Sequence, residues 1–174
     1  SVAQNLTIGP VGALFSAARG GRAMSLGVSG DLAVAAGGRI DLTGRGHDPG
    51  QGPGASVSHN RGDNSTGGAG HGGPGGLALG GDALLDFRGG PAYDSLDNPV
   101  LPGSGGGNTS LDCGFGGGAL LAQVTGTLTL NGRIVADGTS GRVFAQTGGG
   151  SGGTINIRAG SILGSGAMSA RGGD

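Results

Sequence analysis

Short runs in which aliphatic and polar residues alternate recur along the chain, and glycine pairs separate them. The clearest copies are AMSLGVSGDLAVAAGGRIDLTGRG at 23–46, GGALLAQVTGTLTLNGRIVADG at 117–138 and GGTINIRAGSILGSGAMSARGGD at 152–174. Alternation of this kind has the period of a β-strand. Because such short runs cannot bury their apolar faces singly, we expect neighbouring copies to pack around one shared core.

Aligning the copies on a glycine brings apolar residues to equivalent positions. The equivalent residues are Met24, Leu120 and Ile155 in a first strand, Leu32, Leu128 and Ile162 in a second, and Ile40, Ile134 and Met168 in a third. Each copy therefore predicts about three strands. Fainter copies at 2–21, with Leu6, Ile8, Val11 and Leu14, and at 75–90 bring the expected number of copies to about five.

Three short strands that turn at glycine and then repeat predict an all-β fold, a right-handed parallel β-solenoid of about five coils. We expect residues 1–174 to form a single solenoid segment, part of a longer chain or assembly. Glycine-rich loops interrupt the pattern at 44–76, 89–118 and 139–153. Because glycine lets extended, polyproline-like backbones pack closely, these loops are expected to lie side by side on one flank.

The composition narrows the class of protein. Glycine supplies 47 of 174 residues, there is no Trp, all ten basic residues are Arg and all eleven acidic residues are Asp. Lys and Glu, two strong helix formers, are absent, so helical domains are not expected. A net charge of −1 gives no reason to expect nucleic acid as a partner, and no apolar run reaches the roughly 20 residues that membrane insertion requires.

Three N-glycosylation sequons start at Asn5, Asn64 and Asn108, and the last two lie in glycine-rich loops. They predict N-linked glycans. The tripeptide Arg61, Gly62 and Asp63 has the sequence of integrin ligands, although chance also explains it in a chain so rich in glycine. The single cysteine, Cys113, cannot form an intramolecular disulfide, so the pattern of cysteines says nothing of the redox compartment.

Residues able to bind metal or catalyse a reaction are scattered. His47, His59 and His71 are 12 residues apart, which is not the short paired spacing of structural zinc sites, and no calcium-binding nonapeptide recurs. Asp41, Asp86 and Asp137 lie near predicted strand ends in different copies and are interpreted as solvated turn residues. We therefore expect no metal, no cofactor and no enzymatic activity.

Three stretches in succession carry a resemblance to a known class: PAYDSLDNPVLPGSGGG, GGGALLAQVTGTLTLNGRIVADG and GGGSGGTINIRAGSILGSGAMSARGG. They resemble the glycine-rich parallel β-helix repeat regions of very large secreted or cell-surface proteins of algae, protists and bacteria. The resemblance covers roughly residues 70 to 174, and the first 70 residues only loosely. It implies an extracellular architectural segment of a fibre, flagellar hair or wall layer, with no catalytic residues to transfer.

These observations lead to two hypotheses of function. The first is a non-enzymatic structural building block of an extracellular, glycosylated fibre or cell-surface layer, which associates axially with like segments. This hypothesis is based on a predicted strand near residue 1 and on the repeat pattern, which continues up to the last residues, GGD. The second is an adhesin-like binding module that recognises carbohydrate or a surface through its loops.

Overall fold

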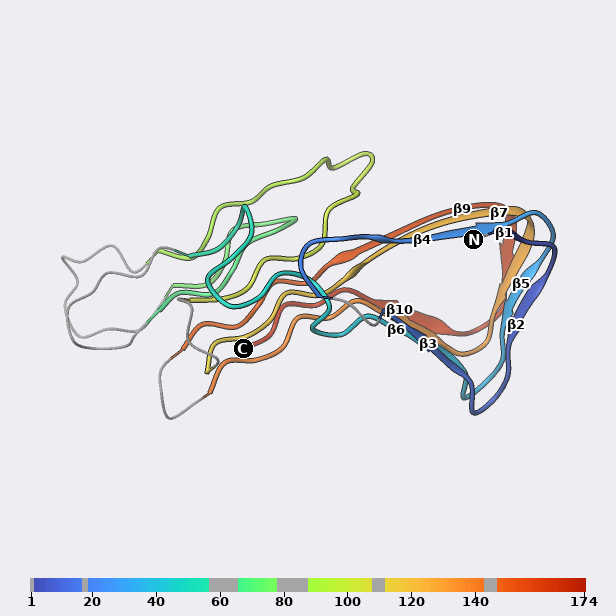
Figure 1. Cartoon of the computed structure of the whole chain (residues 1–174), viewed down its shortest axis with the longest axis horizontal. Helices are drawn as coiled ribbons and strands as arrows, with labels where there is room; N and C mark the ends of the chain where they lie inside the picture. The colour runs from blue at the N-terminus through green and yellow to red at the C-terminus, as the bar shows by residue number, and fades with distance from the viewer. Residues whose placement is uncertain (1, 17–18, 57–65, 78–87, 108–111, 143–146) are drawn as a thin grey trace.

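The computed structural model describes residues 2–16, 19–56, 66–77, 88–107, 112–142 and 147–174 (Figure 1). Within these ranges every regular element is a β-strand. The strands are β1 (Val2–Ala3), β2 (Leu6–Ile8), β3 (Ala13–Phe15), β4 (Met24–Val28), β5 (Leu32–Val34), β6 (Arg39–Asp41), β7 (Ala119–Leu130), β8 (Arg133–Val135), β9 (Thr154–Leu163) and β10 (Ala167–Ser169).

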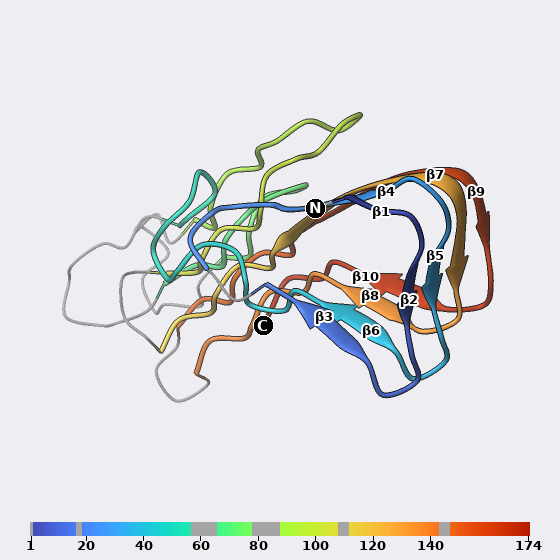
Figure 2. The same cartoon turned by 45° about the vertical axis from the view of Figure 1, so that its right-hand side comes forward.

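The strands form two parallel sheets. The six-stranded sheet has the order β1-β4-β7-β5-β2, with β9 paired to β7, and the four-stranded sheet has the order β10-β8-β6-β3. Strand β7 bends, because its first half pairs with β4 and its last residues pair with β5. Its pairing with β9 shifts register between Val124 and Thr127. The larger sheet consequently curves like half a barrel, and the smaller sheet lies across from it (Figure 2).

The predicted right-handed parallel β-solenoid of about five coils is wrong. The structure contains two separate parallel sheets, one of them bent like half a barrel, and most strands have only two to five residues. The expected copy at 75–90 has no strand in its described residues, and 78–87 lie outside the described ranges. The physical reason is that the shape of the sheets depends on where β7 bends between its pairing with β4 and its pairing with β5, and side-chain alternation does not encode that bend.

The predicted equivalence of apolar positions between copies is confirmed by the register of the sheets. Parallel pairing places Leu6 beside Leu32, Leu32 beside Leu128, and Leu128 beside Ile162. The second series runs Leu14, Ile40, Ile134 and Met168. The core is the space between the two sheets, and Leu32, Leu128, Ile40 and Ile134 are fully buried there.

Val11, expected to face the core, is instead fully exposed. It lies in the turn between β2 and β3. Pro10 before it and Gly12 after it are typical turn residues, so the local signal was present but was outweighed by the apolar side chain.

The glycine-rich segments lie together at one end of the molecule, away from the strands, as the green and yellow trace in Figure 1 shows. We call this part the glycine bundle and define it by residues 44–56, 66–77, 88–107, 112–118, 136–142, 147–153 and 170–174. Its described residues contain no strand. In the described ranges no helix is present that could cross a membrane.

Candidate functional site

Backbone hydrogen bonds between segments hold the glycine bundle together. The Gly103 amide donates to the Gly117 carbonyl (2.8 Å), and three residues later the Gly106 amide donates to the Gly114 carbonyl (2.9 Å). Between them, the Gly105 amide turns to a third segment and donates to the Gln51 carbonyl (3.0 Å). Amides along this segment thus donate to different neighbouring segments, and the amide three residues after Gly103 donates to the same segment as Gly103 does.

The same interval recurs elsewhere in the bundle. The amides of Gly114 and Gly117 donate to the carbonyls of Gly148 and Ser151, at 3.0 and 2.9 Å. Hydrogen bonds that join neighbouring segments at intervals of three residues are a property of packed polyproline II-type helices. In the described residues, glycine-rich segments that are far apart in the sequence therefore lie next to one another.

Glycine is required where two backbones touch. A Cβ added to Gly116 would overlap the carbonyl oxygen of Gly103, and one added to Gly153 would overlap the carbonyl oxygen of Gly118. Backbone atoms cannot move aside as the end of a flexible side chain can. At these positions glycine is therefore a packing requirement of the bundle, whereas Gly72 and Gly73 have no atom within 4 Å of the position of a Cβ.

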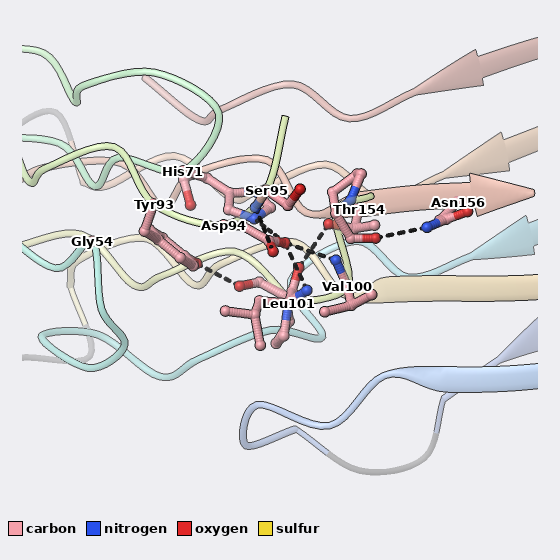
Figure 3. A network of polar contacts seen from close by, with 12 residues as sticks. Gly54, His71, Tyr93, Asp94, Ser95, Val100, Leu101, Thr154 and Asn156 are labelled. Carbon is pink, nitrogen blue, oxygen red and sulfur yellow. Dashed lines mark hydrogen bonds and ion pairs between the residues drawn. The ribbon is translucent and has the colours of Figure 1, made fainter. Parts of the chain in front are cut away.

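A polar cluster lies where the bundle meets the start of β9 (Figure 3). Asp94 is its centre: Oδ2 accepts hydrogen bonds from the amides of Val100 (2.8 Å) and Leu101 (2.7 Å), and Oδ1 accepts one from Ser95 (2.8 Å). Its φ of 72° lies in the left-handed region, which Asp tolerates better than most residues. These bonds close residues 94–101 into a compact loop, here called the Asp94 loop.

The Asp94 loop is fastened to β9. The Thr154 hydroxyl donates to the Leu101 carbonyl (2.7 Å), and the Asn156 amide donates to the Pro99 carbonyl (2.9 Å), as the dashed lines in Figure 3 show for part of this network. Side chains at the beginning of β9 thus bind the Asp94 loop, which lies more than fifty residues before them in the sequence.

His71 joins the Asp94 loop to the glycine bundle. Its Nδ1 lies 2.9 Å from the Gly152 carbonyl oxygen, and because a carbonyl only accepts, Nδ1 carries the hydrogen. Its Nε2 lies 3.4 Å from Asp94 Oδ2. The two side chains are 9% and 6% exposed, so both are sheltered from water.

Tyr93 completes the cluster. Its ring packs against the His71 ring with centroids 4.6 Å apart. Its hydroxyl donates to the Pro102 carbonyl (2.5 Å) and accepts from the Ser104 hydroxyl (3.0 Å). Ser104 Oγ in turn accepts from the Gly54 amide (2.9 Å). The side chains of Tyr93 and Ser104 therefore connect separate segments of the bundle.

The environment shifts the pKa of two of these groups. Burial raises the pKa of the Tyr93 hydroxyl, so it stays protonated and remains a donor. For Asp94, burial acts to raise the pKa, but the amides of Leu101, Ser95 and Val100 together with His71 outweigh it. The pKa of Asp94 consequently lies below its ordinary value.

The polar groups of the cluster are directed at one another. Both nitrogens of His71 face acceptors, the Gly152 carbonyl oxygen and Asp94 Oδ2. The Ser104 hydroxyl is engaged by Tyr93 and Gly54. Groups whose donors and acceptors are satisfied within the protein serve to fix segments relative to one another.

A hollow of about 510 Å³ opens beside the cluster. Its lining includes the polar residues His71, Tyr93 and Asp94 and the apolar residues Leu96 and Ile155. Leu96 is 89% exposed, so the rim on the Asp94 loop is apolar and accessible. Hollows that combine an aromatic ring with a few polar groups are the usual form of small-ligand sites.

The structure places few of the residues predicted to have a function. Asn5 is exposed between β1 and β2, and its side-chain oxygen accepts from the Asp31 amide (2.8 Å). Thr66, the third residue of the Asn64 sequon, is buried and lies 3.8 Å from the Cys113 sulfur. Outside the described residues lie Asn64, Asn108, His59, Asp86 and the tripeptide Arg61, Gly62 and Asp63.

The predicted turn aspartates have structural roles. Asp41 accepts from the Thr43 amide (3.1 Å) and lies 3.7 Å from the Arg39 guanidinium. Asp137 accepts from the Ser169 hydroxyl (2.6 Å) and the Arg171 amide (2.7 Å). Among the described residues no group of three or more His, Cys, Asp or Glu side chains could hold a metal ion.

The Asp94 cluster was not predicted from sequence. Asp94 and Tyr93 occur in PAYDSLDNPVLPG, where prolines and asparagine indicate a turn, but His71 is 23 residues away from Asp94. The only signal available was the single tyrosine of the chain beside an aspartate. Their meeting with His71 depends on how the glycine segments pack, which no side-chain periodicity encodes.

Comparison of the chain with protein-family models, with curated proteins and with solved structures found no match. The resemblance to glycine-rich repeat regions of secreted proteins therefore stays a prediction from the residues. The class that the described structure itself defines is a two-sheet parallel β-protein with a hydrogen-bonded glycine bundle.

Proposed function

We propose that the protein is a non-enzymatic structural building block of an extracellular, glycosylated fibre or cell-surface layer. The observation that carries the proposal is the glycine bundle. Its segments direct their amides to one another at intervals of three residues, which gives a densely connected body without a large apolar core. A rigid body of this kind suits a part that transmits load or keeps a spacing.

The polar cluster supports the same function. The donors and acceptors of His71, Tyr93 and Asp94 are used to tie the Asp94 loop, the bundle and β9 together. A site evolved for chemistry would leave at least one such group directed at a substrate. The low net charge of −1 would suit a surface layer carrying glycans, which solubilise a weakly charged surface.

The test is made on material from the native source. Intact mass is measured before and after treatment with a peptide N-glycosidase, and an antibody to the chain is applied to unbroken and to permeabilised cells. We expect a fall in mass and equal labelling of both preparations. Unchanged mass together with labelling only after permeabilisation would contradict the proposal.

One observation favours a second function, an adhesin-like module that binds carbohydrate. The hollow beside Tyr93 has the size and the mixture of an aromatic ring and polar groups found in small-ligand sites. The test is binding to a glycan array by the wild-type chain and by Leu96→Arg. Leu96 is 89% exposed, so the change should leave the fold intact while placing a bulky charge at the rim.

Binding that disappears in Leu96→Arg and persists in Asp97→Asn, an exposed neighbour on the same loop, would support the adhesin function. The absence of any glycan binding by the wild-type chain would contradict it. Neither result depends on where the protein is located in the cell, so the two functions can be separated.

A further inference from the structure

We propose that a second copy of this chain adds to the β9–β10 edge through its own β1–β3 edge, so that copies join head to tail by parallel strand pairing. This inference rests on the proposed structural function and names the surfaces that would carry it.

The two edges are open in the described structure. Strand β9 pairs with β7 alone and β10 pairs with β8 alone, while β1, β2 and β3 each have a single partner at the opposite side of the sheets. A strand with one partner presents unpaired backbone amides and carbonyls on its other side. The β9–β10 edge is long, because β9 has ten residues.

The β9–β10 edge also exposes side chains that belong to core positions. Ile162 pairs in register with Leu128, so both point to the same face, yet Ile162 is 55% exposed and Leu128 is fully buried. Met168 is 43% exposed, whereas its register partner Ile134 is fully buried. These are the positions that a further layer of strands would cover.

The β1–β3 edge supplies the complementary residues. Leu6 and Leu14 stand at the other ends of the same two in-register series, and both are only partly buried. Translation of one copy along the stacking direction keeps all strands parallel and places Leu6 next to Ile162 and Leu14 next to Met168. Each apolar series would then continue from one copy into the next.

Charge does not oppose this contact. Arg39 and Arg133 are in-register neighbours inside one chain, but the positions in line with them at the two edges are Ala13 and Ala167. Joining two copies therefore brings alanine beside alanine and does not lengthen the row of arginines. Arg158 is the single charged residue in β9 and β10, and neither strand contains the Lys or Pro that commonly protects an edge.

The contact joins two different surfaces, so it does not close on itself. A heterologous contact generates a ring if its rotation closes and an open filament if it does not, and near-translation along the stacking direction gives a filament. The occupant is consequently another copy in the same orientation, not a copy related by a two-fold axis that binds through the identical edge.

One edge variant on each side provides the test. Ile162→Arg places a charge at the β9 edge, and Ile162→Val is its control. Thr7→Pro acts at the β2 edge, because Leu6 donates inward to Asp31 and Ile8 accepts inward from Ala35. The Thr7 amide between them then points outward, and its removal spares the internal bonds. Thr7→Val is the matched control.

The measurement is sedimentation velocity over a range of concentrations on chains made without N-glycans, because Thr7 belongs to the Asn5 sequon and its variants cannot be modified there. Electron microscopy of the same samples and circular dichroism verify assembly and folding. We expect concentration-dependent polymers from the wild type and both controls, and monomers from each edge variant alone. A mixture of the two edge variants should form dimers and stop, because each retains one competent edge.

Several outcomes would overturn the proposal. A wild-type chain that stays monomeric, Thr7→Pro protein that still dimerises by itself, or a mixture that does not associate would each do so. Should Ile162→Arg fail to fold, Met168→Arg takes its place at the same edge. A wild-type chain that stays monomeric when made without N-glycans, while the native protein is glycosylated and displayed on cells, would reject this contact alone and leave the proposed function standing.

A glycan on Asn5 and a copy on the β1–β3 edge exclude each other, since Asn5 lies between β1 and β2. Assembled material should therefore be unmodified at Asn5 when its peptides are mapped by mass spectrometry. Full occupancy of Asn5 in filaments would also contradict the proposed edge.

Discussion

At Gly116 two backbones approach so closely that a hydrogen atom fits and a methyl group does not. A Cβ there would overlap the Gly103 carbonyl oxygen, which belongs to a neighbouring segment of the bundle. Gly72, in contrast, is exposed and has no atom within 4 Å of the position of a Cβ. Glycines of the same chain thus differ in whether the fold needs them.

We expect Gly116→Ala to destabilise the protein by about 3 kcal/mol or more, because backbone segments must move apart to accept the methyl group. Gly72→Ala should cost nothing and could stabilise by up to about 1 kcal/mol through the unfolded state. Chemical denaturation of both variants measures the difference. Equal stability of the two would show that the bundle does not pack as described.

Asp94 gives stability a dependence on pH. Because its pKa in the folded protein lies below the ordinary value, its stabilising contribution is present above the unfolded pKa of about 3.8 and is lost as pH falls through the folded pKa. His47 acts in the same direction, since burial lowers its pKa and acid must charge it. Its contribution begins to fall as pH drops below about 6.5.

We expect Asp94→Asn to remove part of the acid sensitivity, seen as a flatter dependence of melting temperature on pH below about 4. The variant should also be less stable at neutral pH, because in either orientation its side-chain NH₂ would face a backbone amide, that of Ser95 or those of Val100 and Leu101. Asp97→Asn, on the exposed surface of the same loop, is the control and should follow the wild-type curve. A wild-type slope in Asp94→Asn would be inconsistent with this role.

At the scale of elements, position in the sheet decides the energetic weight of a residue. Leu128 in β7 and Ile162 in β9 are register partners with the same inward orientation. The first is covered by strands on both sides and the second on one side only. Their exposed fractions, 0% and 55%, follow from this difference and not from their side chains.

Leu128→Ala should therefore cost about 2–5 kcal/mol, as expected for a cavity in a packed core. The register-matched Ile162→Ala should cost less than about 1 kcal/mol in a monomer, because water already reaches that side chain. Thermal or denaturant unfolding at low protein concentration makes the comparison. Similar losses for both variants would mean that β9 is covered in solution.

At the scale of the whole molecule, the sheets and the glycine bundle are continuous with each other. The chain leaves the strands after β6, traverses the bundle, returns at β7, and enters the bundle again after β8 (Figure 1). Direct hydrogen bonds also cross between the parts, from the Gly118 amide to the Leu42 carbonyl (2.8 Å), for example. No single break in the chain would separate the sheets from the glycine bundle.

We expect the two parts to unfold in one transition. Tyr93 is the single tyrosine, and the chain has no tryptophan, so intrinsic fluorescence reports on the bundle while far-ultraviolet circular dichroism reports mainly on the sheets. The two signals should have the same midpoint in urea. In Gly116→Ala both midpoints should fall together, whereas loss of the fluorescence transition alone would show an independent bundle.

Sequence reasoning succeeded where side chains alternate. Leu32, Leu128 and Ile162 were placed at equivalent positions, because an aliphatic residue every second position has one solution, a strand with one buried face. It failed at Val11, where a single apolar residue in a turn has no such constraint. It also divided β7 into two strands, since the glycine at 126 reads as a turn although the strand only bends there.

The architecture and the polar cluster could not be obtained in this way. The expected regular solenoid gave way to two sheets, one curved like half a barrel, because the curvature follows from where β7 shifts register and not from its composition. His71, Tyr93 and Asp94 meet only because glycine segments fix their separation. The sequence of those segments is mostly glycine and has no side-chain periodicity that would predict which segments are neighbours.

By itself the sequence determined the strands, their inward faces and the need for close backbone contact, because alternation and glycine content act locally on the chain. Only the tertiary structure decided which segments of the bundle are neighbours, which glycines are indispensable and which core positions stay open at the β9 edge. Those choices depend on backbone hydrogen bonds between segments far apart in the chain, and backbone groups are the same in every residue.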